Sequence, residues 1–230
     1  MTEVEWLTGQ KRPLAMYDHV STRSPSPRKL QLVAAAACQL AKGVSETPVL
    51  QRGIEVLERY AEGLASEEEF TRTRAQIDDL PTRTFASVVS LAMNSSPPAA
   101  TRLVVIGVPR LVFGDAWSER RARNVGERVR RSLCRVFREI FGNPFRPFIP
   151  VPSWQGGGVI QPDGRTVMFT DAVKGIADAV HVTGDFGRLP ILADALEEAG
   201  VTDEVLLAHC RDGGPHLRGC WALDVVRGRG

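Results

Sequence analysis

Apolar residues recur at every third or fourth position between residues 115 and 141, which is the spacing of one face of an α-helix. Gly142 follows the last of them, as glycine commonly does where a helix ends. Asp115 stands where a capping residue would satisfy the first backbone N–H groups. The pattern therefore predicts one long amphipathic helix from Asp115 to about Phe141. Its apolar face consists of Ala122, Val125, Val129, Leu133, Val136, Phe137 and Ile140.

The first ninety residues carry the start signals of several shorter helices. Thr2 with Glu5, and Ser66 with Glu69, have the capping-box spacing, in which a hydroxyl and a carboxylate each bond a backbone N–H at the helix start. Two further starts combine a capping residue with proline at the first helical position, at Ser26-Pro27 and Thr47-Pro48. We expect helices near residues 27–43, 48–63, 67–79 and 83–93.

A break at residues 94–98, Asn-Ser-Ser-Pro-Pro, follows this helical half and is predicted to be a linker. The apolar run 103–108 comes next, and it fits a buried strand as well as a short buried helix, because periodicity cannot separate the two. Pro109 is expected to end it. The sequence predicts three regions: an N-terminal helical region, 1–93, a linker with a short apolar segment, 94–114, and a C-terminal region, 115–230. Alternatively, the first and last of these form one continuous domain.

The C-terminal half begins with four prolines within residues 143–152, which predict an extended crossing. A Pro-Asp-Gly turn then separates two short apolar stretches, which predicts one small β-hairpin around 159–169. Further helices are expected at 171–182, at 189–199 and from a Thr202 cap to about 210. The last apolar segment, 220–226, fits a helix or a strand, and a helix is favoured because Leu217, Trp221 and Val225 share one face. The predicted fold class is mostly α, a bundle-like multi-helix domain with a long central helix.

The composition of the chain indicates its cellular location but not its function. The chain has 230 residues, 43% of them hydrophobic, and a formal net charge of +2, so no electrostatic partner is implied for the chain as a whole. No apolar stretch reaches the roughly 18 residues that a membrane span needs, and the acidic N-terminus does not resemble a signal peptide. We expect a cytoplasmic protein without a membrane partner, whose four cysteines are thiols or ligands.

The segment 209–221 concentrates the residue types that carry chemistry. It holds two of the four cysteines and two of the four histidines around a Gly-Gly-Pro break. These are soft nitrogen and sulfur donors, of which zinc takes four in a tetrahedral site. The candidate metal ligands are Cys210, His216, Cys220 and His209.

Several interpretations of this segment stay open. The nine residues between Cys210 and Cys220 do not match the close cysteine pairs of common zinc motifs, and both thiols also fit a buried core. A redox pair of the two cysteines is a further alternative. A nucleophilic pair of His209 with Cys210 is disfavoured, because adjacent residues point about 100° apart on a helix. Zinc is therefore the only cofactor that the sequence suggests.

Arginines crowd the long helix outside its apolar face. Eight lie between residues 120 and 138, against three glutamates between 119 and 139. Such a run is typical of a solvated, ion-paired helix face, and it also suits a phosphate backbone or an acidic partner. The candidate binding residues are Arg120, Arg123, Arg128, Arg131, Arg135 and Arg138.

Several strings resemble a large, uncharacterised paralogous family of planctomycete bacterial proteins. They are Ile140–Pro147 (IFGNPFRP), Leu189–Gly200 (LPILADALEEAG) and His209–Trp221 with its HCR and GPHLRGCW parts, while 2–7 and 61–69 resemble the family's N-terminal half. Relatives tend to have several cysteines near residues 34–38, where this chain keeps only Cys38. The resemblance implies a shared architecture and no particular activity.

These observations favour a non-enzymatic interaction or regulatory module with a protein partner. A nucleic-acid-associated protein that uses the arginine-rich helix, residues 118–138, is one alternative. A structural zinc protein that uses the C-terminal Cys/His cluster is the other. No nucleophile elbow or phosphate loop is present in the sequence, so an enzyme is the least favoured class.

Overall fold

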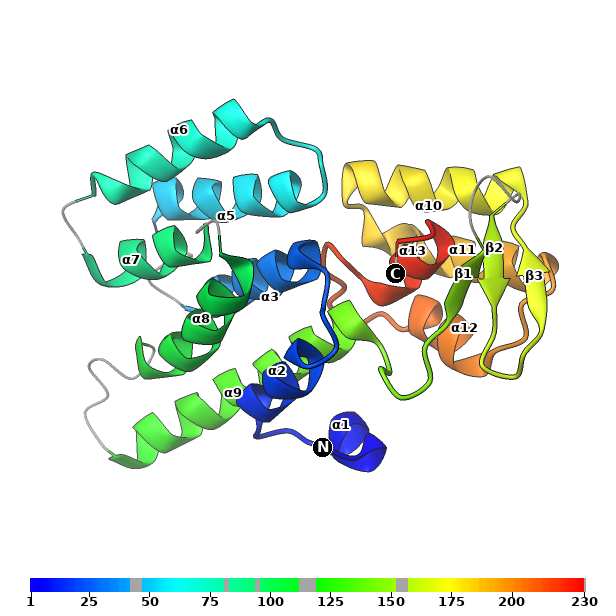
Figure 1. Cartoon of the computed structure of the whole chain (residues 1–230), viewed down its shortest axis with the longest axis horizontal. Helices are drawn as coiled ribbons and strands as arrows, with labels where there is room; N and C mark the ends of the chain where they lie inside the picture. The colour runs from blue at the N-terminus through cyan, green and yellow to red at the C-terminus, as the bar shows by residue number, and fades with distance from the viewer. Residues whose placement is uncertain (42–46, 81–82, 94–95, 112–118, 152–156, 230) are drawn as a thin grey trace. The chain divides into compact units, whose positions relative to one another are not determined.

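The computed structural model describes residues 1–41, 47–80, 83–93, 96–111, 119–151 and 157–229. The described chain is mostly helical, with one small antiparallel sheet, as the sequence predicts (Figure 1). It divides into two compact units, Met1–Ile140 and Phe141–Gly230. The described residues contain no helix with both the length and the apolar character that crossing a membrane requires.

Helices make up the first unit. They are α1 (Glu3–Thr8), α2 (Pro13–Ser21), α3 (Pro27–Gln39), α5 (Pro48–Ala61), α6 (Glu67–Asp78), α7 (Arg83–Ala92), α8 (Pro97–Leu111) and α9 (Glu119–Phe141), whose last residue lies past the division. The capping box of Thr2 and Glu5 is complete, and the Ser66 hydroxyl accepts a bond from the Glu69 N–H. Ser26 and Thr47 are also N-cap residues followed by proline at the first helical position, and neither side chain makes a capping hydrogen bond.

The core of the first unit forms around α3, which packs against α5, α7 and α8 (Figure 1). Its alanines 34–37 and Cys38 are almost fully buried, and such short side chains let neighbouring helices approach closely. Gly53 on α5 serves the same purpose, since a Cβ there would lie 2.2 Å from Ile77 Cδ1 of α6. Small residues therefore set how tightly this unit packs.

Residues 97–111 form one helix, which decides the open choice for the apolar run and corrects the expected end at Pro109. The helix, α8, begins at Pro97 within the predicted break and packs against α3. The apolar run 103–108 is helical, and Pro109 lies inside α8 rather than ending it. Val104, Val105 and Val108 fill the core, and this burial outweighs the low helix propensity of β-branched residues.

The second unit combines a small sheet with further helices. Its elements are β1 (Ile149–Val151), β2 (Gly158–Ile160), β3 (Thr166–Met168), α10 (Asp171–Thr183), the 3₁₀ turn η2 (Phe186–Arg188), α11 (Leu189–Glu198), α12 (Glu204–Arg211) and α13 (Trp221–Val226). The strands pair antiparallel in the order β1-β2-β3. The predicted hairpin is therefore confirmed, and part of the proline-rich crossing adds a strand to it.

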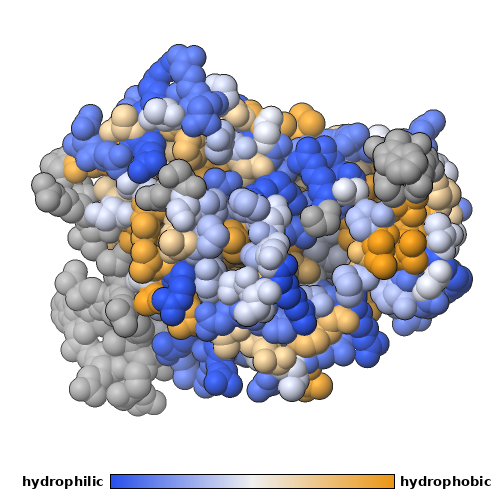
Figure 2. Space-filling model, in the orientation of Figure 1, coloured by the Kyte–Doolittle hydropathy of each residue, from blue (hydrophilic) through white to orange (hydrophobic). Residues whose placement is uncertain are grey.

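One face of this sheet is covered and the other is apolar and accessible. Val159 and Val167, opposite each other in the register, are buried in the core of the unit. Ile149 and Met168 lie on the other face and are 55% and 45% exposed. Figure 2 shows an apolar patch over the strands of this sheet.

The division between the units lies inside α9, after Ile140, rather than within the predicted linker region 94–114. The division falls one residue before α9 ends at Phe141, and the apolar spacing alone does not mark the helix end as a boundary between units. The predicted Asp115 cap lies outside the described residues.

Candidate metal centre

The turn between α12 and α13 holds the candidate site. Asp203 begins α12, since its Oδ1 accepts a bond from the Leu206 N–H at 2.9 Å. Thr202, the expected cap, instead presents its backbone N–H to Gln161 Oε1 at 3.2 Å. Helix α12 ends at Arg211, and Cys220 is the N-cap residue of α13. The turn therefore brings residue 209 at the end of one helix close to residue 220 at the start of the next.

Three donor side chains converge there. His209 Nε2 lies 3.2 Å from Cys220 Sγ. The ligand atoms of His209, His216 and Cys220 all lie within 4.8 Å of one another. Cys220 is fully buried, whereas both histidines are half-buried. Two imidazoles and one thiol thus share a space of the size that a single metal ion requires.

The tautomer of His216 follows from its backbone contact. Its Nε2 lies 2.9 Å from the Asp212 carbonyl oxygen, and a carbonyl oxygen can only accept, so Nε2 carries the proton. A neutral imidazole then keeps its lone pair on Nδ1. A ring nitrogen that donates to a backbone carbonyl while the other nitrogen faces the metal is the usual arrangement of a histidine ligand.

Aromatic packing fixes the two imidazole rings. The His209 ring centroid lies 4.9 Å from that of His216, at an interplanar angle of 73°, and 4.9 Å from that of Trp221. Trp221 stacks in turn on Phe148, with centroids 5.6 Å apart. Gly142, at φ +62°, makes room for this indole, since a Cβ there would lie 3.0 Å from the Trp221 ring. The rings therefore hold His209 close to Cys220.

Ion pairs and a backbone contact hold the turn from outside. Arg211 bonds Asp194 Oδ1 at 3.1 Å and Glu197 Oε2 at 2.6 Å, both on α11. Arg218 donates to the His181 carbonyl oxygen of α10 at 2.8 Å. The acidic residues of α11 thus act as partners of an arginine, in keeping with an ordinary amphipathic helix.

The remaining cysteines are not among the grouped donors. Cys210, a predicted ligand, is fully buried in the apolar cluster of the second unit and is not among the grouped donors. Cys38 and Cys134 are buried in the first unit, where desolvation raises the pKa of Cys38 to about 12 and also raises the pKa of Cys134. A buried thiol of this kind stays protonated and behaves as a small apolar side chain.

The predicted arginine surface is partly described. Arg128, Arg131 and Arg135 are exposed on α9, whereas Arg138 is partly buried and donates to the Trp6 and Gly9 carbonyl oxygens at 2.8 and 2.9 Å. Arg138 therefore holds the end of α1. The side chains of Arg120 and Arg123 lie outside the described residues.

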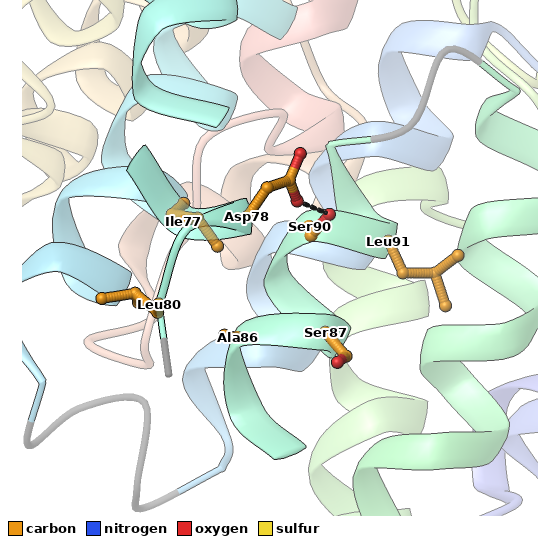
Figure 3. A pocket seen from close by; sticks show the side chains of 7 residues that line it. All are labelled: Ile77, Asp78, Leu80, Ala86, Ser87, Ser90 and Leu91. Atoms are coloured by element: carbon orange, nitrogen blue, oxygen red, sulfur yellow. Dashed lines mark hydrogen bonds between the residues drawn. The ribbon is translucent and has the colours of Figure 1, made fainter. Parts of the chain in front are cut away.

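A separate small pocket, of about 260 Å³, lies beside α6 and α7 (Figure 3). Its polar groups are Asp78, Ser87 and Ser90, and the Ser90 hydroxyl donates to Asp78 Oδ1 at 2.5 Å. Apolar side chains complete the lining. Its lining includes neither a histidine nor a cysteine, so the trio in the second unit is the stronger candidate for a metal site.

Comparison with known proteins adds no family: no family model matches the chain, and neither a curated protein nor a solved structure matches it significantly. The interpretation of the site therefore rests on its own geometry.

The sequence predicted four ligands. The structure groups three of them, His209, His216 and Cys220, but not the fourth, Cys210. The signal that separates His209 from Cys210 is the 100° between adjacent helical residues, since only one of the two can face the turn. Cys210 faces the apolar cluster and His209 faces Cys220.

Proposed function

We propose that the C-terminal unit binds one zinc ion through His209, His216 and Cys220, and that the ion fixes the turn between α12 and α13. The observation that supports this proposal is the convergence of three donor atoms within 4.8 Å. Two imidazoles beside a thiol form a donor set that suits zinc. The role is structural, so the protein is proposed to act as a metal-stabilised module rather than as an enzyme.

The spacing of the donors fits a tetrahedral ion. Zinc–sulfur and zinc–nitrogen bonds of about 2.3 and 2.0–2.1 Å place the two ligand atoms about 3.6 Å apart at a tetrahedral angle. His209 Nε2 and Cys220 Sγ are 3.2 Å apart, so a shift of a few tenths of an ångström would admit the ion. A structural zinc site takes four donors, so water or another side chain would supply the fourth.

The burial of Cys220 favours a ligand over a nucleophile. A thiolate that attacks a substrate has to be reached by it, and Cys220 has no exposed surface. A zinc-bound thiolate needs no such access. The contact between His209 and Cys220 is therefore better explained by a shared metal than by Cys-His catalysis.

The test is the zinc content of protein purified without a histidine tag. We expect about one equivalent of zinc per chain, by elemental analysis, and its loss in His209→Ala, His216→Ala and Cys220→Ser. Cobalt substitution should also produce a thiolate-to-metal charge-transfer band, which reports directly on the sulfur ligand.

The matched control is Cys210→Ser. Both cysteines are fully buried in the same apolar cluster, but it is the Cys220 sulfur that lies 3.2 Å from His209 Nε2 and belongs to the grouped donors. Cys210→Ser should keep the zinc and the cobalt band. Wild-type protein with less than about a tenth of an equivalent of zinc after incubation with the metal would refute the proposal, and so would equal zinc loss in the two serine variants.

A further inference from the structure

The first unit presents a row of arginines on the outer side of α9. Arg128, Arg131 and Arg135 are all exposed. At 100° and 1.5 Å per residue they lie within about 60° of one another around the helix and span about 10 Å along it. The row therefore forms a narrow, straight strip of positive charge, which we call the arginine strip.

The opposite side of the helix is buried. Leu133, Phe137 and Ile140 have no exposed surface, and Val129 and Val136 are 7% and 6% exposed. This packing fixes the helix, so the strip is held in one orientation. Between 126 and 141 the chain has five arginines and two glutamates.

The nearest carboxylate removes little of this charge. Glu127 lies between two cations, with its Oε1 3.2 Å from Lys11 Nζ and its Oε2 3.5 Å from Arg131. A single negative charge shared by two positive ones leaves the group positive. Arg138, three residues after Arg135, holds α1 through two backbone carbonyl oxygens and is left out of the strip.

The composition of this face distinguishes among anionic partners. Protein interfaces have an apolar or aromatic centre, whereas the exposed residues of 126–141 include no large hydrophobic side chain. Proteins that bind single strands stack bases on aromatic rings. Of the two phenylalanines in this stretch, Phe137 is fully buried, and Phe141, which is half-buried, is the first residue of the second unit. A strip of charge without apolar surface suits the regular phosphates of a duplex.

We infer that the arginine strip binds the phosphate backbone of duplex nucleic acid without sequence preference. Arginine suits this contact because its planar guanidinium donates two parallel hydrogen bonds to a phosphate. The strip lies wholly in the first unit, so this inference does not depend on the zinc centre.

The test is fluorescence anisotropy with a labelled 20-base-pair DNA duplex and a matching RNA duplex. Three phosphate contacts predict a slope of about −2.7 in a plot of log K against log salt, which is an approximately 40-fold loss of affinity between 50 and 200 mM salt. Arg131→Gln should lower that slope by about 0.9, whatever the sequence of the duplex.

The triple variant R128E/R131E/R135E should abolish binding at about 50 mM salt. The matched control, R52E/R72E/R74E, makes the same change in net charge at arginines of α5 and α6 that already pair with carboxylates of α6. It should bind as the wild type does, with circular dichroism confirming that both variants fold.

Three outcomes would overturn the inference. One is no anisotropy change with either duplex at about 50 mM salt. Another is equal loss of binding in the two triple variants, which would mean that net charge and not the strip is responsible. The third is binding to polyglutamate but to neither duplex, which would assign the strip to an acidic protein.

Discussion

The two units surround their buried cysteines with different kinds of side chain. Cys38 in the first unit lies in the apolar cluster around α3, where burial raises its thiol pKa to about 12. Cys220 in the second unit is equally buried but lies 3.2 Å from an imidazole nitrogen, with a second imidazole close by. Burial alone therefore does not distinguish a core thiol from a ligand; the neighbours of the sulfur do.

Both units join helices through arginine–carboxylate pairs, as Arg59 does with Glu69 in the first unit and Arg211 does with Asp194 and Glu197 in the second. The second unit differs in the nitrogen and sulfur donors that gather in the turn between α12 and α13. If the proposed zinc ion is bound there, the second unit should respond to its removal, whereas the first should respond to changes in packing and charge.

Metal removal is the largest effect that we expect. If zinc binds the folded turn and is present at about a thousand times its dissociation constant, chelation costs about 4 kcal/mol of local stability. Hydrogen exchange should then show faster exchange in 204–226 after EDTA treatment, with α3 and α5 unchanged. If residues 204–226 are equally protected from hydrogen exchange with and without EDTA, the two units do not differ in their dependence on metal.

Loss of a buried ion pair should be the next largest effect, and it belongs to the first unit. Arg28 and Glu62 are 2.7 Å apart, with side chains only 16% and 1% exposed. Breaking a buried pair leaves a poorly solvated charge, so Glu62→Ala should lower the free energy of unfolding by about 3 kcal/mol. Urea denaturation measures this value.

The control for that variant is Glu68→Ala. Glu68 pairs with Arg72 one helical turn away, and these side chains are 81% and 65% exposed. An exposed pair of this kind contributes about 0.5 kcal/mol or less. Similar losses in the two variants would mean that Glu62 is not the special contact that its burial indicates.

Local signals in the sequence were sufficient for most helix boundaries. The capping box at Thr2 and the Thr47-Pro48 pair mark helix starts that the structure confirms, because capping depends on residues three or four positions apart. The helical state of 103–108 depends on packing between distant residues, since α8 lies against α3. Periodicity within so short an apolar run does not contain that information.

The candidate metal centre was also only partly predictable from the sequence. The Gly-Gly-Pro break and the nearby cysteines and histidines drew attention to 209–221, but four donors were available and the fold groups three of those four. Which of His209 and Cys210 faces the turn is decided by how α12 rotates against α11 and α13, and only tertiary contacts set that rotation.

Packing of α5 against α6 gives the smallest effect and the sharpest test of the first unit. A Cβ at Gly53 would lie 2.2 Å from Ile77 Cδ1 and 3.3 Å from Val89 Cγ1. Overpacking typically costs about 1–3 kcal/mol, while alanine gains about 1 kcal/mol over glycine in a helix. Gly53→Ala should therefore destabilise the protein by about 1 kcal/mol.

Ile77→Val alone should cost about 0.5–1.5 kcal/mol. Because valine at position 77 lacks Cδ1, the atom that a Cβ at position 53 would meet, the double variant should lose less free energy of unfolding than the two single variants lose together. Additive losses in urea denaturation would mean that the close approach of the two helices does not limit packing there.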